Sequence, residues 1–204
     1  MSKIDFKKEL KHLYNPSGKE ISLVDVPPMN FVMIDGAGDP NTAKEYEEAI
    51  EALYAVSYAL KFAVKKEQAI DYGVMPLEGL WWADDMSDFA ASKDSWKWTA
   101  MIMQPKYVTP ALYQTVLKQV EKKKAMPGFS KARFQSFAEG KAAQIMYIGP
   151  FADEGPTIER IHAFIKQNGN VFDGLKQKHH EIYLGDPRKT APEKLKTVIR
   201  QPYR

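Results

Sequence analysis

The chain has 204 residues, of which 44% are hydrophobic and 27% charged, and it contains no cysteine. This balance is typical of a globular protein and excludes collagen-like and intrinsically disordered chains, while the lack of cysteine excludes disulfides and cysteine-ligated zinc. The net charge of +3 is too small to favour nucleic acid as a partner. No apolar run approaches the roughly 18 residues that cross a bilayer, and the first residues lack a signal-peptide pattern, so we expect a cytoplasmic protein without a membrane partner.

Four segments have the apolar spacing of amphipathic helices. The longest is expected to begin with a capping-box pattern, in which Thr42 and Glu45 satisfy backbone amides at the helix start. Another is expected to begin at Thr109, which precedes a proline at the first helical position. The four predicted helices cover residues 6–13, 41–66, 109–124 and 156–168.

Strand-like segments lie between these helices. The fourth and fifth of them are predicted to form a hairpin that turns at Glu139 and Gly140. The predicted strands cover residues 30–35, 75–82, 96–104, 133–137, 142–148, 179–184 and 196–201.

The order of the elements indicates an internal duplication. Strand, helix, strand and strand follow one another in both halves, and FVMIDGAGDP in the first half parallels IMYIGPFADEGP in the second. In each, an apolar strand runs into glycine, an acidic residue and proline just ahead of the helix. We therefore expect one α+β domain over residues 1–204, with repeats at about 29–105 and 131–204 joined by a helix at about 109–124. Two such repeats can pair about a pseudo-twofold axis and leave a concave cleft between them, where small-molecule sites tend to form.

The sequence contains no established catalytic or cofactor motif. Gly36 and Gly38 lack the third glycine and the strand–turn–helix context of a dinucleotide site, and turn chemistry explains both. The adjacent histidines His179 and His180 point to opposite faces of a strand and cannot easily hold one metal ion. We expect no metal and no cofactor.

The tryptophans are the unusual feature of the composition. All four lie between positions 81 and 98, on two predicted neighbouring strands. Trp81 and Trp82 should point to opposite faces of the sheet, whereas Trp96 and Trp98 should share one face. Two interpretations stay open: ordinary packing in the core, or flat surfaces in the cleft for a flat or cationic ligand.

A glutamate in the strand at 179–184 is the main candidate for a site. Alternation places Glu181 and Tyr183 on one face and the apolar Ile182 and Leu184 on the other, which we expect to face the helices. Glu181 and Tyr183 would then face the concave side, although this face could also be only the solvated side of the sheet. Glu78 lies in the matching strand of the first half, so the cleft could hold two carboxylates.

The C-terminal segment resembles the closing signature of the GyrI-like small-molecule-binding family. Residues 181–202, EIYLGDPRKTAPEKLKTVIRQP, contain Glu-x-Tyr, a DPR-type turn, PE-x-L and T-x-I-x-x-P. Residues 147–151, YIGPF, resemble the family's G-x-Y/F loop before its helix. The resemblance covers most of the chain and implies two strand–helix–strand–strand repeats.

The resemblance also implies a function. It places on Glu181 the glutamate that meets lipophilic, often cationic, aromatic compounds, with Trp81, Trp82, Tyr147 and Tyr183 as candidate cleft aromatics. A stand-alone, monomeric multidrug-type binding protein is the leading interpretation, since no DNA-binding segment is recognisable. The alternative is a hydrolase that opens the cyclopropane of DNA-alkylating natural products, with Glu181 as its catalytic group.

Overall fold

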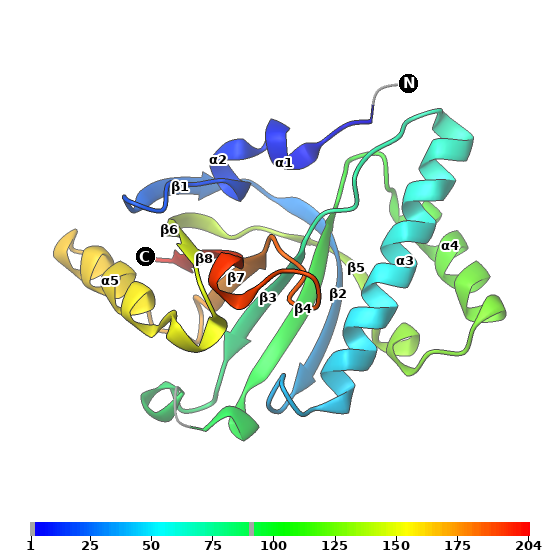
Figure 1. Ribbon diagram of the computed structural model, residues 1–204. Helices are drawn as coiled ribbons and strands as arrows, with labels where there is room; N and C mark the ends of the chain where they lie inside the picture. The colour runs from blue at the N-terminus through cyan, green and yellow to red at the C-terminus, as the bar shows by residue number, and fades with distance from the viewer. Residues whose placement is uncertain (1–2, 90–91) are drawn as a thin grey trace.

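The computed structural model describes residues 3–89 and 92–204. Within these residues a single eight-stranded antiparallel sheet has helices packed against it (Figure 1), so the predicted α+β class is confirmed. The strands lie side by side in the order β1-β6-β8-β7-β3-β4-β2-β5. They are β1 (Ser22–Val26), β2 (Met29–Ala37), β3 (Leu77–Trp82), β4 (Lys97–Gln104), β5 (Arg133–Phe137), β6 (Gly140–Ile148), β7 (His179–Tyr183) and β8 (Lys196–Pro202).

Two short helical turns and three longer helices accompany the sheet. The predicted start of the helix at 109–124 is confirmed, because the hydroxyl of Thr109 accepts a hydrogen bond from the backbone N–H of Leu112 at 3.2 Å. None of the helices in the described part of the chain is long and apolar enough to cross a membrane. The helices are α1 (Phe6–Glu9), α2 (Lys11–Tyr14), α3 (Lys44–Gln68), α4 (Pro110–Lys123) and α5 (Gly155–Gln167).

The start of α3 differs from the prediction. The helix begins after Ala43, and no side chain caps it, so the predicted capping box of Thr42 and Glu45 is wrong. The backbone carbonyl of Asp39 instead accepts hydrogen bonds from the N–H groups of Thr42 and Ala43, at 3.1 and 2.7 Å. A turn that begins at Asp39 therefore directs the chain into the helix.

The sheet has two equivalent halves that meet in its middle. The sequence β6-β8-β7 on one side mirrors β2-β4-β3 on the other, and each half has its helix between the first and second of these strands along the chain. The two halves join where β7 pairs with β3, in a register that sets Glu181 opposite Gly79. Two strand–helix–strand–strand repeats related by a pseudo-twofold axis are thus present.

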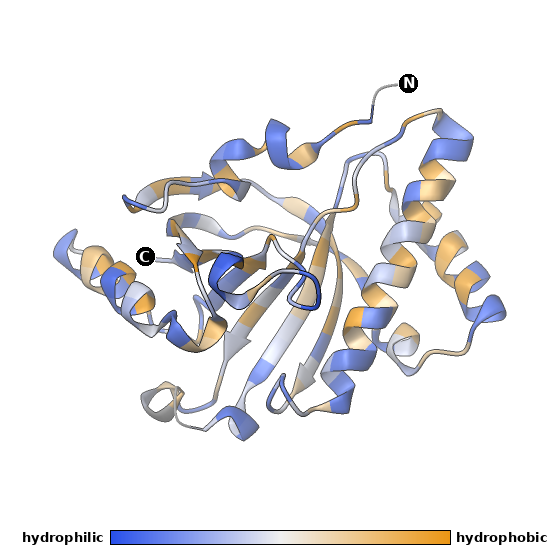
Figure 2. Cartoon of the chain, viewed as in Figure 1, coloured by the Kyte–Doolittle hydropathy of each residue, from blue (hydrophilic) through white to orange (hydrophobic). Residues whose placement is uncertain are grey.

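Both long repeat helices lie on one face of this sheet, here called the helix face. Tyr46 of α3 packs against Trp81 of β3 with ring centroids 5.5 Å apart, and Ile161 of α5 packs with Ile199 of β8. Glu181 lies on the same face, because the register pairs it with Ile199 and opposite residues in an antiparallel pair point the same way. Figure 1 shows α3 and α5 on either side of the central strands, and Figure 2 shows hydrophobic residues interspersed with hydrophilic ones along both helices. Glu181 therefore lies on the strand between the two helices.

The opposite face, here called the inner face, is also buried. Ile182 is fully buried there in the main hydrophobic core, together with Leu13 and Tyr14 of the N-terminal segment. The prediction that Ile182 faces the helices is therefore wrong. Since both faces of the sheet are covered, apolar character does not indicate which face carries the helices.

Two further features were not expected from the sequence. Strand β1 pairs with β6, and β5 pairs with β2 at the other edge of the sheet, so the predicted hairpin at Glu139 and Gly140 is wrong. Gly140 does adopt a positive φ of 75°, as a turn requires. The turn, however, carries the chain from one edge of the sheet toward the other, because β1 already occupies the edge of β6.

Candidate functional site

Glu181 lies in the middle of the helix face and is only 7% exposed. Its neighbours two positions away on the same strand both hydrogen-bond to it. His179 approaches one carboxylate oxygen through Nε2 at 2.7 Å, and the Tyr183 hydroxyl donates to the other at 2.6 Å. The side-chain amide nitrogen of Gln201 lies against Nδ1 of His179, which leaves Nε2 to carry the hydrogen that Glu181 accepts.

Aromatic rings form the wall beside this carboxylate. Trp81 donates its indole N–H to the Tyr183 hydroxyl at 3.0 Å, and its ring lies close over Gly79, the residue opposite Glu181. A Cβ added at Gly79 would lie 2.6 Å from the indole nitrogen. Tyr46 of α3 packs against Trp81 from the other side. The strand alternation of β3 and β7 thus places a carboxylate beside two aromatic side chains, and α3 adds a third.

The hydrogen bonds keep Glu181 ionised in spite of its burial. Burial by itself raises the pKa of a carboxyl group, but the hydrogen bonds that Glu181 accepts, first from His179 and also from Tyr183, outweigh it and hold the pKa of Glu181 below its usual range. Burial, followed by the negative charge of Glu181, raises the pKa of the Tyr183 phenol well above its usual value. Tyr183 therefore stays a donor at neutral pH.

A second carboxyl group, that of Glu154, touches the first. Glu154 immediately precedes α5, and its side chain hydrogen-bonds to Glu181. Its oxygen Oε2 is buried and accepts no hydrogen bond from any of the described residues. Two carboxyl groups in such contact must share a proton, and burial together with the charge of Glu181 raises the pKa of Glu154 to about 10. Glu154 is therefore the neutral member of the pair.

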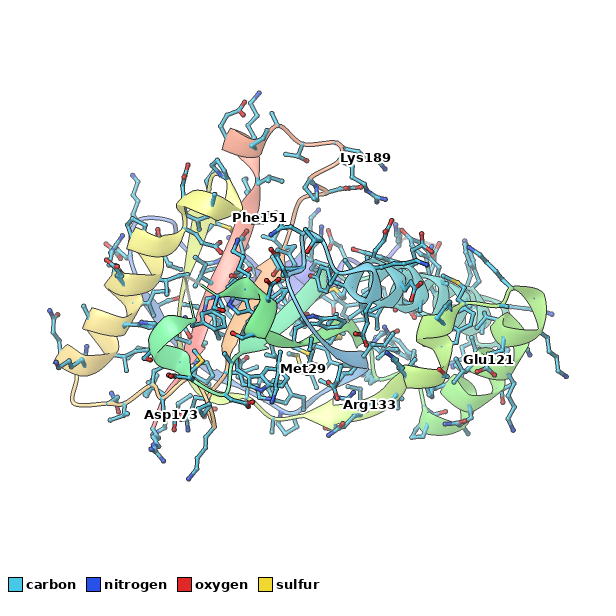
Figure 3. The ribbon with its side chains drawn as sticks, turned by 90° about the horizontal axis from the view of Figure 1, so that it is seen from below. Met29, Glu121, Arg133, Phe151, Asp173 and Lys189 are labelled. Carbon is cyan, nitrogen blue, oxygen red and sulfur yellow. The ribbon has the colours of Figure 1, made fainter. Side chains whose placement is uncertain are left out.

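The segment ahead of α5 covers the pair. The ring of Phe151 packs edge-on against Tyr183 at 5.5 Å, and the Tyr147 hydroxyl donates to the carbonyl of Pro150 at 2.9 Å. Figure 3 shows Phe151 at the end of α5 that is nearest the middle of the sheet. Of the predicted aromatics, Tyr183 and Trp81 therefore adjoin Glu181, and Tyr147 holds the covering segment.

Two predicted site residues lie elsewhere. Glu78 pairs in register with Ile182 and points to the inner face, so the prediction that it shares a cleft with Glu181 is wrong. Trp82 also points away from Glu181, because it alternates with Trp81, and the Lys178 ammonium lies 3.3 Å above its ring. Trp82 lines a separate surface hollow of about 390 Å³.

Glu78 belongs instead to a buried ionic network on the inner face. His180 contacts Glu78 at 3.0 Å through one ring nitrogen and Glu139 at 2.8 Å through the other, so both nitrogens must carry a hydrogen. Arg200 donates to the second oxygen of Glu139 at 3.0 Å, and the Tyr14 hydroxyl donates to Glu78 at 2.8 Å. Two carboxylates thus balance two cations with no contact to solvent, which makes this network structural.

Burial opposes both charges in the centre of the network, and their partners outweigh it. The carboxylates of Glu139 and Glu78 raise the pKa of His180 to about 9. His180 and Arg200 lower the pKa of Glu139 to about 2. Both groups therefore stay charged across the neutral range.

Sequence reasoning missed two polar members of the site, His179 and Glu154, and the aromatic rings of Tyr46 and Phe151. Strand alternation puts His179 on the same face as Glu181, but its bond to Glu181 depends on the ring orientation that Gln201 fixes. The sequence pattern could have indicated Glu154, since an acidic residue precedes the helix in both repeats. In the described part of the chain no three His, Asp or Glu side chains are arranged to hold a metal ion.

Comparison with known proteins identifies the family. The model of the GyrI-like small molecule binding domain matches residues 19–204. The class that the fold and this buried carboxylate define is thus a small-molecule-binding domain of two repeats. The chain belongs to the GyrI-like family. No curated protein matches it significantly.

Solved structures agree with this assignment. The chain is 39% identical to an uncharacterised conserved protein from Listeria innocua, covering 99% of this chain and 100% of that one with a TM-score of 0.91. It is 38% identical to a structure described as a hydrolase from Listeria innocua, covering 99% and 100% of the two chains with a TM-score of 0.85. The C-terminal domain of EcmrR shares the fold at 11% identity, with a TM-score of 0.55 over 91% of this chain and 97% of that domain.

Proposed function

We propose that the chain binds lipophilic aromatic cations at Glu181, between α3 and α5. The observation that carries this proposal is an ionised carboxylate buried among aromatic side chains. Its own pKa is held low, so it offers a full negative charge, and Trp81, Tyr183 and Phe151 supply flat apolar surface next to it. Family membership supports a small molecule as the ligand.

The physical basis is desolvation. A carboxylate away from water attracts a cation more strongly than an exposed one, because the low local dielectric screens the charges less. An aromatic cation adds stacking on Trp or Tyr, worth roughly 0.5–2 kcal/mol per contact. The charge attraction and the stacking energy both depend little on the exact shape of the ligand. This favours broad specificity for flat cations over recognition of one compound.

Intrinsic fluorescence tests the proposal. Trp81 contacts Tyr183 beside Glu181, so a bound N-methylacridinium ion should quench tryptophan emission in a saturable way. We expect a Kd of roughly micromolar, or about −8 kcal/mol. Trp81→Phe should remove most of the quenching and, because phenylalanine lacks the indole N–H that reaches Tyr183, lower the affinity measured by calorimetry about 5–10-fold. Quenching that is linear and never saturates would refute binding.

A second candidate function is hydrolysis of a strained electrophile at the same site. The observation in its favour is the hydrolase description of a structure that is 38% identical over the full length. Glu181 would take a proton from water as the water oxygen attacks a cyclopropane carbon. The carbon–carbon bond of the ring breaks, its electron pair moves into a conjugated carbonyl, and the carbonyl oxygen takes up a proton from a second water. Glu181 then returns its proton to the hydroxide left behind, so that the sum is the addition of one water.

Turnover separates the two functions. Losing a general base costs about 10²–10⁴-fold, so Glu181→Gln should abolish opening of an activated cyclopropane followed by chromatography. The substitution Glu159→Gln, on the exposed surface of α5, is the matched control and should leave the rate unchanged. If the wild-type protein binds the substrate and gives no acceleration over buffer, the function is binding alone.

A further inference from the structure

We propose that Glu154 is the displaceable partner of Glu181. A bound cation takes the place of the Glu154 side chain, which rotates into the solvent and releases one proton. This inference rests on the proposed binding of aromatic cations at Glu181. It names Glu154 as the group that the ligand displaces. It also assigns a monocation to the site as its ligand and states that this cation is exchanged for one proton.

Three side chains hydrogen-bond to Glu181, and their positions in the fold show which of them a ligand can displace. His179 and Tyr183 lie on the same strand as Glu181, in the middle of the sheet, and other side chains hold both in place. Glu154 lies outside the sheet, at the start of α5. A ligand that reaches Glu181 without breaking the sheet must therefore replace the contact with Glu154.

Displacement requires a rotation of one side chain only. The backbone carbonyl of Glu154 accepts hydrogen bonds from Thr157 and Ile158 at 2.9 and 3.1 Å, so the main chain is fixed as the start of the helix. The residues on both sides, Asp153 and Gly155, are exposed. A rotated Glu154 carboxyl thus reaches solvent directly, at a helix N-terminus that favours a negative charge.

The proton follows from the change in surroundings. In the closed pair Glu154 is neutral, because burial and the charge of Glu181 raise its pKa to about 10. In water neither cause acts, so the group returns to the ordinary acidity of a glutamate and ionises at neutral pH. The balance is one cation bound at Glu181 and one proton passed from Glu154 to the buffer.

Other titratable groups face the pair and must be distinguished. His179 and Tyr183 adjoin Glu181 from β7, Tyr46 faces it from α3, and Lys93 acts on Glu154 from the segment before β4. A proton exchanged by any of these would still be exchanged when Glu154 is replaced. Only the proposed release disappears with the carboxyl group of Glu154.

Calorimetry of N-methylacridinium binding in two buffers of different ionisation enthalpy counts the protons directly. For the wild type we expect close to one proton released per ion bound, and a Kd that falls about tenfold per pH unit between about pH 6 and 8. In Glu154→Gln, whose amide can still donate to Glu181, both effects should vanish. Glu159→Gln, the exposed control on α5, should behave as wild type.

The outcomes separate this inference from the proposed function. Saturable binding by the wild type without proton release, or a release that persists in Glu154→Gln, would overturn the role of Glu154 and leave cation binding at Glu181 intact. No binding of the ion to any of the proteins would overturn both. Thermal unfolding of each variant, measured in parallel, shows whether the protein is folded during the titration.

Discussion

A single glycine determines how the aromatic wall meets the carboxylate. Gly79 lies directly across from Glu181, and the indole of Trp81 occupies the space that a side chain at Gly79 would fill. The close approach allows the indole N–H to reach Tyr183, which in turn donates to Glu181. The absence of one methyl group therefore allows a chain of two hydrogen bonds to form.

Substituting this glycine should weaken the site without abolishing the fold. In Gly79→Ala the new Cβ would lie 2.6 Å from the indole nitrogen, so Trp81 must move and its hydrogen bond to Tyr183 should be lost. We expect affinity for N-methylacridinium to fall about 5–10-fold, or about 1 kcal/mol, the worth of one hydrogen bond.

Gly73→Ala is the matched control, because its Cβ would meet only ordinary contacts beginning at 3.6 Å. It should bind the ion as the wild type does. Equal affinity of Gly79→Ala and wild type would show that the position of Trp81 does not matter for binding.

For single residues, the sequence predicts which side chains of a strand share a face, but not which residues of other elements contact them. The alternation in residues 179–184 correctly placed Glu181 and Tyr183 on one face. The contact of Glu154 with Glu181 could not be predicted, because it depends on where the end of α5 lies over the sheet. Glu78 was expected in the cleft because it lies in the matching strand, but membership of a strand does not give the face, and the register puts it on the inner face, where His180 and Tyr14 bind it.

The N-terminal element α2 is attached to the sheet by polar groups as well as by packing. Arg200 donates to the carbonyl of Leu13 at 2.7 Å, and Gln144 donates to the carbonyl of His12 at 2.6 Å. The hydroxyl of Tyr14 completes the attachment by donating to Glu78. A helix of four residues has little stability of its own, so these bonds hold it over the inner face.

Removing the Tyr14 hydroxyl should therefore lower the free energy of unfolding by more than the loss of an ordinary hydrogen bond does. Tyr14→Phe leaves the buried charge of Glu78 with one donor fewer, and we expect the free energy of unfolding to fall by about 1.5–3 kcal/mol in urea denaturation. Tyr58→Phe, on the exposed surface of α3, removes a hydroxyl without such a partner and should change little. A loss below about 0.5 kcal/mol for Tyr14→Phe would contradict the attachment.

Helices and strands with strong periodicity could be predicted within two or three residues of their ends. The pairing of strands could not, because β5 and β6 are adjacent in sequence but lie in different halves of the sheet. Strand β1 was not predicted, since its five residues include Asp25 and show no sustained apolar alternation. Long-range pairing decides both cases, and local patterns carry no information about it.

Across the whole molecule, the buried network should set the pH range of highest stability. The pKa of Glu139 is lowered to about 2, so its contribution is present above about pH 4.5 and is lost as the pH falls toward 2. The pKa of His180 is raised to about 9, so its contribution is complete below about pH 6.5 and is lost as the pH rises toward 9. Stability from this pair is therefore highest between about pH 4.5 and 6.5.

Urea denaturation across the alkaline range tests this linkage. The measurement uses Glu154→Gln, because Glu154, whose pKa is raised to about 10, would itself lower stability over the same pH range. In this variant the free energy of unfolding should fall by up to about 3 kcal/mol from pH 6.5 to 9, since one pKa unit corresponds to about 1.4 kcal/mol. His162, whose pKa is lowered by burial, affects stability only below this range. A free energy that is constant from pH 6.5 to 9 would show that His180 is not charged in the folded state.

The central claim is that the carboxylate of Glu181 binds a ligand cation, and a comparison of two ligands of the same shape tests it most directly. Calorimetry at about pH 8 compares N-methylacridinium with acridine, which is neutral at that pH, for wild type, Glu181→Gln and the surface control Glu159→Gln. We predict that Glu181→Gln loses about 1–3 kcal/mol of binding free energy for the cation and almost none for acridine, while the control matches wild type. Equal losses for both ligands in Glu181→Gln would contradict the claim and leave Glu181 a structural residue.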